Sequence, residues 1–261
     1  MKILTSNDDG VEAKGNIVLR EQLAKTYDVY TIAPDTERSS CGHRISLDRP
    51  LRYQKVDEKV YSCSGFPADC MLLGLSGVLE DIPGPELVVS GINIGANLGQ
   101  DRYYSGTIAA AREATFRGTK AMACSLVIGD YRAPKHFETA AQVVHELINL
   151  GVYKLIPDRH LLNINVPNLT LGQLSGVDLT SGGFQKYSQE VIKRKDARGK
   201  EYFWVGGIHE GHEDIEGSDC NSVELGKVAV ELQNVTGNNN TLDPDILHEI
   251  KDLLKDLERS F

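Results

Sequence analysis

Short apolar runs alternate with longer amphipathic segments through the first part of the chain. Residues 2–6 and 28–33 are compact apolar runs that predict buried strands, whereas residues 15–27 repeat their apolar positions at helical spacing. Strand, helix and strand at this spacing predict a βαβ unit with a right-handed crossover. The same patterns predict further strands at 86–90 and 121–128 and further helices at 67–79, 108–116 and 136–150. The order favours an α/β protein, a Rossmann-like three-layer sandwich around a mostly parallel sheet.

Other segments alternate apolar and polar residues, which is typical of antiparallel strands. Residues 44–63 predict a hairpin beside the parallel core, and residues 182–204 predict an extended hairpin arm. Strands are also predicted at 162–166, 177–179 and 223–232. We therefore divide the chain into a catalytic core, residues 1–160, and a C-terminal oligomerisation region, residues 161–261.

The last helix is predicted to begin at Asp243-Pro244. Its apolar stripe must be buried against something, and it consists of Ile246, Ile250, Leu253, Leu254 and Leu257. A polar link, residues 237–241, precedes it. A loose link before an apolar helix permits exchange of that helix between subunits, so we expect a swapped terminal helix. The alternative is that the helix packs on its own core.

Composition narrows the range of partners. The 261 residues are 41% hydrophobic and 25% charged, as in ordinary globular proteins, and the formal net charge is −9. An acidic chain is a poor match for a nucleic-acid polymer or an anionic membrane, although a small phosphorylated substrate remains compatible. Five scattered cysteines without a C-x-x-C pair predict reduced thiols. With no signal-peptide pattern and no run of ~18 apolar residues, we expect a cytoplasmic protein.

The first predicted strand ends in Asn7-Asp8-Asp9-Gly10. Two adjacent carboxylates at a strand exit cannot both stay ionised near apolar neighbours without a counter-charge. A hard divalent cation with oxygen ligands, Mg²⁺ or Mn²⁺, is a suitable partner. The alternative is a polar turn in which one aspartate caps the next helix.

Polar residues follow the other core strands as well. Ser39 and His43 lie in the loop after the second strand, and Asn93 and Asn97 lie between glycines after residue 90. Glycines 91, 95 and 99, four residues apart, predict a loop whose backbone approaches a ligand closely. The spacing is neither the dinucleotide fingerprint nor the Walker motif. A loop serine or histidine is, however, often only a solvated turn residue.

Ser105-Gly106-Thr107 opens an alanine-rich helix. Backbone N–H groups, two hydroxyls and the helix dipole can form an anion site there, although a simple helix cap is equally compatible. His209 and His212 suggest a second metal cluster, but a solvated surface loop is the better interpretation.

All these loops follow predicted strands at one edge of the sheet. In open parallel sheets, ligands bind at that edge, beside the topological switch point. The joint placement of two carboxylates, one hydroxyl and one amide oxygen predicts a hard metal shell with positions left for water and phosphate.

These motifs, together with Gly65-Phe-Pro-Ala-Asp-Cys70, Tyr202-Phe-Trp-Val-Gly206, Gly217-Ser-Asp219 and Glu231, resemble those of the survival protein E family over most of the chain. The resemblance implies a metal-dependent nucleotidase with one divalent metal per subunit. It implies metal ligands at Asp8, Asp9, Ser39 and Asn93, and phosphate contacts at Asn97 and Ser105 to Thr107. It also implies a homodimer or homotetramer. Cys41, Arg44 and Phe66 depart from the family pattern near the expected substrate pocket.

The function that we predict is metal-dependent hydrolysis of nucleoside 5′- or 3′-monophosphates. Asp8 and Asp9 hold the metal, and one of them could also orient the attacking water. Ser105, Gly106 and Thr107 bind the phosphoryl group, and His43 is a candidate general base. The alternatives are a phosphatase acting on short polyphosphate and a non-catalytic nucleotide-binding module.

Overall fold

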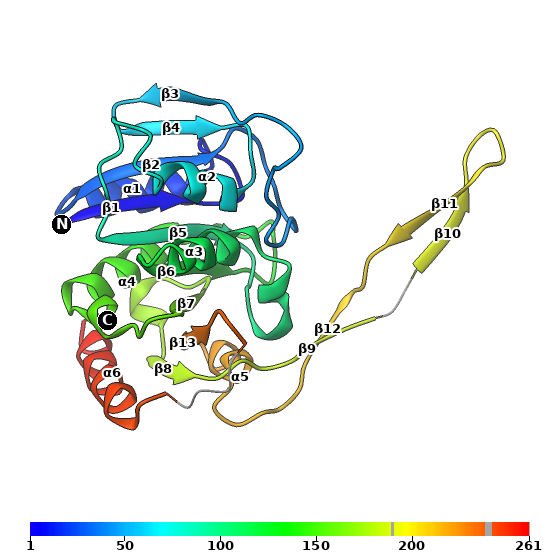
Figure 1. Ribbon diagram of the computed structural model, residues 1–261. Coiled ribbons are helices and arrows are strands. Elements are labelled where there is room, and N and C mark those ends of the chain that lie inside the picture. The colour runs from blue at the N-terminus through cyan, green and yellow to red at the C-terminus, as the bar shows by residue number, and fades with distance from the viewer. Residues whose placement is uncertain (189–190, 238–241, 261) are drawn as a thin grey trace.

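The computed structural model describes residues 1–188, 191–237 and 242–260. Its centre is a nine-stranded sheet in the order β3-β4-β2-β1-β5-β6-β7-β13-β8 (Figure 1). The six strands from β4 to β7 are parallel. At one end of the sheet β3 pairs antiparallel with β4, and towards the other end β13 pairs antiparallel with β7 and parallel with the last strand, β8. The bounds are β1 (Lys2–Ser6), β2 (Asp28–Pro34), β3 (Tyr53–Asp57), β4 (Val60–Cys63), β5 (Leu87–Ile94), β6 (Lys120–Val127), β7 (His160–Pro167), β8 (Val177–Thr180) and β13 (Val228–Asn234). The predicted α/β three-layer sandwich is confirmed.

Helices cover both faces of this sheet. Three pack into the apolar cluster on one face: α1 (Lys14–Ala24), α4 (Phe137–Asn149) and α6 (Pro244–Glu258). Two lie in the cluster on the other face: α2 (Pro67–Gly74) and α3 (Gly106–Phe116). The shorter helices are α5 (Asp219–Glu224), η1 (Gly99–Tyr103), η2 (Val152–Leu155) and η3 (Leu171–Gln173). None of the described helices is long and apolar enough to cross a membrane.

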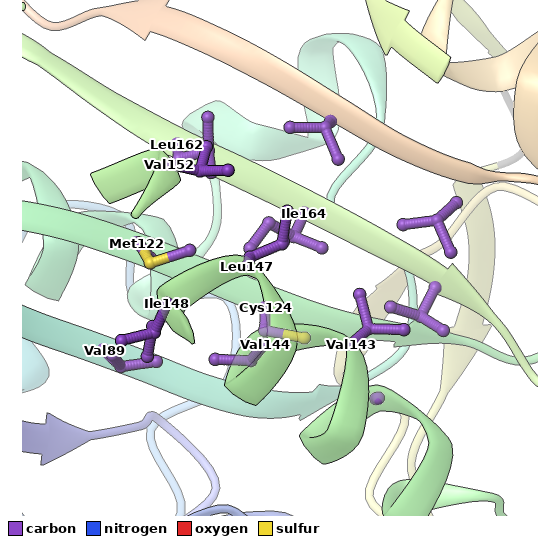
Figure 2. Close-up of a cluster of buried hydrophobic side chains, with 14 of the residues drawn as sticks. Val89, Met122, Cys124, Val143, Val144, Leu147, Ile148, Val152, Leu162 and Ile164 are labelled. Carbon is purple, nitrogen blue, oxygen red and sulfur yellow. The ribbon is translucent and has the colours of Figure 1, made fainter. Parts of the chain in front are cut away.

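The two faces are separated by the pleat of the strands. Leu87 and Val89 of β5 lie in the first cluster and Val88 between them lies in the second, because successive strand residues point to opposite faces. Figure 2 shows α4 side chains, among them Leu147 and Ile148, beside side chains of β5, β6 and β7. Full burial of each such side chain contributes roughly 1.5–3 kcal/mol. This double-sided core explains the near-continuous apolar runs of the central strands.

Two predicted elements end elsewhere than expected. Helix α2 stops at Gly74 instead of residue 79, because the chain turns at Gly77 with φ at +72°, and Val78 is 75% exposed. The hairpin predicted at 44–63 forms only as β3 and β4, and residues 44–52 are not a strand. The apolar stripe of the helix and the alternation of the hairpin therefore both overstated the length of the element.

The prediction of a loop from Gly91 was wrong for residues 91–94, which continue strand β5. The pairing of β5 with β6 shifts register between Ser90 and Asn93. Gly91 has φ at +139°, and a Cβ there would lie 2.4 Å from the carbonyl oxygen of Cys124. Glycine is needed for this close approach inside the sheet.

The strand predicted at 223–232 begins only at Val228. Residues 219–224 form α5 instead, and the Ser218 side chain accepts a hydrogen bond from the Asn221 backbone to cap it. The alternating apolar residues that follow led to the prediction of a strand, although the serine cap indicates a short helix.

The predicted arm is confirmed and continues beyond residue 204. It consists of two antiparallel pairs that extend away from the body of the molecule (Figure 1). Its strands are β9 (Gln185–Tyr187), β10 (Val191–Lys195), β11 (Glu201–Val205) and β12 (His209–His212).

The expected exchange of the terminal helix is not what the structure shows. Helix α6 begins after the Asp243 cap as predicted, but Ile250, Leu254 and Leu257 are buried in the core of the same chain. Packing against β8 and α4 gives the apolar stripe a partner without a second subunit. Of the predicted link, residues 238–241 lie outside the described residues.

Candidate active site

The first strand, β1, lies between β2 and β5, at the point where the order in which strands are added to the sheet changes side. From β1 the chain passes to β2 on one side, and later returns to β5 on the other side of β1. This is a topological switch point, where open α/β sheets bind ligands. A pocket of about 1140 Å³ lies there, lined by Asp8, Asp9, Ser39, Asn93, Asn97 and Ser105 among others. The structure thus brings most of the predicted site residues together.

Asp8 is buried and held by the start of α3. The backbone N–H of Gly106 donates to its Oδ2 at 3.2 Å, and the Thr107 hydroxyl donates to its Oδ1. A Cβ on Gly106 would lie 2.7 Å from the Asp8 Cβ, so only glycine lets the helix approach this closely. Thr107 is fully buried, and neither it nor Gly106 lines the pocket. These two residues position Asp8, and of the predicted helix-start residues only Ser105 faces the pocket.

Burial governs the charge state of the two carboxylates. Burial raises the pKa of Asp8 above its usual value despite these hydrogen bonds. Burial, followed by the Asp8 charge, raises the pKa of Asp9 to about 7. Asp9 also accepts a hydrogen bond from the Ile94 backbone at 3.3 Å. Among the described residues that line the pocket, Lys14 is the single Lys or Arg. When Asp8 and Asp9 are both ionised, a bound cation would stabilise the two carboxylates.

Ser39 and Asn93 add neutral oxygen donors to the same pocket. The Ser39 hydroxyl donates to Glu37 at 2.8 Å and keeps its lone pairs, while the Asn93 amide nitrogen donates to the Gly95 carbonyl at 2.9 Å. The Asn93 amide oxygen thus remains available. Two carboxylates, a hydroxyl and an amide oxygen form a set of oxygen ligands that suits Mg²⁺ or Mn²⁺ and not softer metals.

The described residues contain no group of three or more His, Cys, Asp or Glu placed to hold a metal.

Asn97 belongs to a buried amide network. Its backbone N–H donates to Asn165, its carbonyl accepts from Asn163 and Asn165, and its side-chain nitrogen donates to Ser125 at 2.7 Å. These bonds hold the Asn97 side chain in one orientation at the pocket wall. We did not single out the two asparagines of β7 from the sequence. A polar residue within an apolar strand gives no sign in the sequence of the distant residue that it contacts.

His43 does not reach the pocket. Its Nε2 lies 3.0 Å from Glu113 Oε2 on α3, and its ring lies beside Phe116. The loop thus places His43 beside the last turns of α3, away from the helix start that meets Asp8. The geometry gives it no contact with a substrate in this pocket.

The three departures from the family pattern also lie outside the pocket lining. The Cys41 Sγ would be 2.8 Å from a Cβ on Gly106, so this thiol packs behind the Asp8 turn, and burial raises its pKa to about 11. The Arg44 guanidinium lies 4.6 Å from the centre of the Phe66 ring. All five cysteines are unpaired, as predicted.

The base of the hairpin arm forms a part of the pocket wall that the sequence did not reveal. Gln185, Tyr187, His209 and His212 line the pocket together with Asp101 of η1. The pattern at 209–214 showed only two histidines near each other, with nothing to place them beside residues that lie far away in the chain.

The comparisons with known proteins all point to the same protein family. Residues 3–189 match the family model described as "Survival protein SurE". The "5'-nucleotidase SurE" of Geotalea uraniireducens is 41% identical over 234 residues, which cover 88% of this chain and 91% of that protein. That of Nitrosococcus oceani is 42% identical, covering 88% and 90%. The crystal structure of the SurE protein from Aquifex aeolicus superposes with a TM-score of 0.80 at 33% identity, covering 99% of this chain and all of that one.

Proposed function

Because this chain belongs to the survival protein SurE family, we propose that it is a metal-dependent 5′-nucleotidase that hydrolyses the phosphate monoester of nucleoside monophosphates. The relatives named above carry the 5′-nucleotidase description. The family supports a phosphatase acting on nucleotides. The dependence on a metal, activity on 3′-monophosphates and the roles of individual residues are parts of this proposal.

The observation that carries the proposal is the convergence of Asp8, Asp9, Ser39 and Asn93 on one pocket at the switch point. They lie at or after the ends of three different strands. Asp8 is buried, Asp9 is partly buried, and both carboxyl groups have raised pKa values. Buried carboxylates without a basic partner are costly unless a cation or protons neutralise them. A site of this kind is better explained by metal binding than by a surface turn.

The chain's own residues would divide the work of hydrolysis. Asp8 and Asp9 supply the negative ligands, and Ser39 and Asn93 supply neutral oxygens. A divalent cation held by these four residues would supply positive charge to the phosphoryl group and would make water a stronger nucleophile. Asp8 is held by Gly106 and Thr107, whereas Asp9 is less buried and is the better candidate to orient the attacking water.

Asn97, Ser105 and Lys14 are the residues we assign to the phosphate. Each lines the same pocket, and they offer an amide, a hydroxyl and an ammonium group. The Ser105 hydroxyl accepts a hydrogen bond from the Ile108 backbone at 3.1 Å, which leaves its own proton free for a phosphate oxygen. Thr107 and Gly106 contribute indirectly, through Asp8.

The test is phosphate release from a panel of nucleoside 5′- and 3′-monophosphates, with Mg²⁺ or Mn²⁺ and with a chelator. We expect release from the 5′-monophosphates that stops on chelation and returns when metal is added. Full activity in chelator would contradict the metal assignment. Tight nucleotide binding without any phosphate release would favour the non-catalytic module instead.

We also propose that residues 161–261 include the subunit contact of a homodimer or homotetramer, with the hairpin arm as its main element. The arm extends from the body (Figure 1) and exposes large apolar side chains: Ile192, Phe203, Trp204 and Val205. Exposed apolar patches of this kind mark interaction sites in soluble proteins.

A further inference from the structure

The base of the arm contributes side chains to the pocket that the proposed hydrolysis does not use. Asp101 comes from η1, Tyr187 from β9 and His209 from β12. None of them is among the residues assigned to the metal or the phosphate. A pocket of about 1140 Å³ is also far larger than a phosphate group needs.

These side chains are fixed by hydrogen bonds. The Gln100 side-chain amide donates to the Gln185 carbonyl at 2.7 Å and accepts from the Gln185 N–H at 2.8 Å, which ties β9 to η1 as a neighbouring strand would. The Tyr187 hydroxyl donates to Asp101, and His209 Nε2 lies 2.9 Å from Gln185 Oε1. A recognition surface held this way binds a ligand with little loss of side-chain entropy.

The same bonds leave acceptors available to a ligand. Because the Gln185 oxygen can only accept, His209 Nε2 is the donor of this pair, and Nδ1 of the neutral imidazole is then an acceptor for a ligand. A carboxylate offers about four acceptor positions, of which Tyr187 occupies one on Asp101. Hydroxyl groups of a sugar and amino groups of a base are donors of the matching kind.

Aromatic rings are also presented to the pocket. Tyr104 and Tyr131 line it and are 65% and 63% exposed. Stacking of a base on an aromatic side chain favours binding and does not depend strongly on which base is stacked. Exposed rings beside fixed acceptors suit a flat heterocycle attached to a polyol.

We propose that Asp101, Tyr187 and His209, together with the rings of Tyr104 and Tyr131, form the nucleoside subsite of this pocket. The inference rests on the proposed nucleotidase function and names the residues that recognise the part of the substrate that is not transferred. The arm base thus selects the nucleoside while the strand ends bind its phosphate.

The charge of this part of the pocket adds a second consequence. Asp101 and Glu224 are carboxylates in the lining, and Glu224 pairs with His212 at 3.3 Å. Lys14, the single Lys or Arg among the described lining residues, is assigned to the transferred phosphate. A second phosphate on the substrate would therefore meet these carboxylates without a Lys or Arg of its own. The subsite therefore favours monophosphates over diphosphates and over short polyphosphate.

The first experiment measures binding of adenosine, which carries no phosphate, by calorimetry to the full chain with Mg²⁺ present. The variants are His209→Ala and Tyr187→Phe, and the control is His248→Ala, a histidine on α6 that is 78% exposed and outside the pocket. Thermal unfolding verifies that each variant is folded. We expect the Kd for adenosine to rise roughly 3- to 12-fold in both variants and to stay unchanged in the control. His209→Ala removes a hydrogen bond to the ligand, and Tyr187→Phe removes the hydroxyl that fixes Asp101. Absence of binding to the unmodified chain, or equal binding by all variants, would overturn the subsite.

The second experiment compares kcat/KM for adenosine 5′-monophosphate with kcat/KM for phenyl phosphate, which lacks a nucleoside. We expect the ratio to fall several-fold in His209→Ala and Tyr187→Phe, mainly through KM. Asp101→Asn should narrow the preference for the monophosphate over adenosine diphosphate. Ratios equal to those of the unmodified enzyme would overturn the inference. If the unmodified chain binds adenosine through these residues but hydrolyses no nucleotide, the proposed function fails and the subsite stands.

Discussion

The turn after β1 and the hairpin arm both contribute side chains to the pocket, but they are held in very different ways. Asp8 is buried and fixed by contacts with Gly106 and Thr107, which lie almost a hundred residues further along the chain. The turn follows a strand whose neighbours on both sides are parallel strands of the central sheet. Displacing Asp8 would therefore disturb the start of α3 and the core together.

The arm has no comparable core of its own. Its outer part is one pair of short strands, β10 and β11, whose residues are all exposed. Isolated two-stranded ribbons are marginally stable in water, so the outer arm depends on a partner or on its anchored base. The difference matches the roles that we propose. Hydrolysis, which requires fixed geometry, is proposed for the rigid sheet edge, nucleoside recognition for the anchored base of the arm, and subunit contact for its exposed outer part.

The largest effect is expected for Asp9→Asn. Loss of one negative metal ligand should lower kcat by at least about 100-fold, because the metal and the attacking water lose their position. The fold should persist, and the stability of the metal-free protein above about pH 7 should rise, since the cost of burying the Asp9 charge and its repulsion by Asp8 are both removed. Phosphate release and thermal unfolding in chelator measure both effects. Near-normal turnover at saturating Mg²⁺ and Mn²⁺ would show that Asp9 is not a ligand.

Gly106→Ala tests the rigidity of the Asp8 turn. The new Cβ would lie 2.7 Å from the Asp8 Cβ and 2.8 Å from the Cys41 Sγ. Overpacking of this kind costs roughly 1–3 kcal/mol, which should lower Tm by roughly 2–12 °C and reduce activity as Asp8 moves. Gly84→Ala is the control, because its Cβ would meet nothing within 4 Å. An unchanged Tm in Gly106→Ala would mean that the turn can move to accommodate the new methyl group, and that Asp8 is not rigidly held.

Metal binding should stabilise the protein in a pH-dependent way. Asp9 has its folded-state pKa raised from 3.8 to about 7, so its protonated form stabilises the metal-free fold at low pH. That contribution is lost as the pH rises through about 7, where the unfolded chain has long released the proton. Mg²⁺ needs the ionised carboxylates, so it should raise Tm more at about pH 8 than at about pH 5. A shift in Tm that is equal at both pH values, or persists in Asp9→Asn, would place the metal elsewhere.

The smallest effect on the fold of the single chain is expected in the arm. Trp204→Ser changes a side chain that is 64% exposed, so the free energy of unfolding of a single chain should change by no more than about 0.5 kcal/mol. If the arm joins subunits, the mass in solution should fall, as measured by light scattering after gel filtration. Tyr53→Ser on β3, which removes another exposed aromatic residue, is the matched control. A solution mass equal to that of the unmodified protein would remove the arm from the subunit contact.

The sequence by itself determined the elements whose signals are local. The apolar run at 2–6, the serine cap before α3 and the Asp243-Pro244 start of α6 each specify their element within a few residues. Hydrophobic periodicity and capping groups act over one or two turns, so they can be read without knowledge of the rest of the chain. The placement of Asp8, Asp9, Ser39 and Asn93 in one pocket also followed, because parallel strands bring their carboxyl ends to the same edge.

Only the tertiary structure decided the features that depend on distant partners. Gly91 extends β5 instead of opening a loop because the Cys124 carbonyl lies against it, and the Gly106 N–H donates to the Asp8 carboxylate. His43 lies against Glu113 outside the pocket, while His209 lies inside it because Gln100 ties β9 to η1. Helix α6 packs on its own chain because β8 and α4 present an apolar surface at the right place. Each outcome depends on a contact between residues far apart in the chain, and local periodicity carries no information about such contacts.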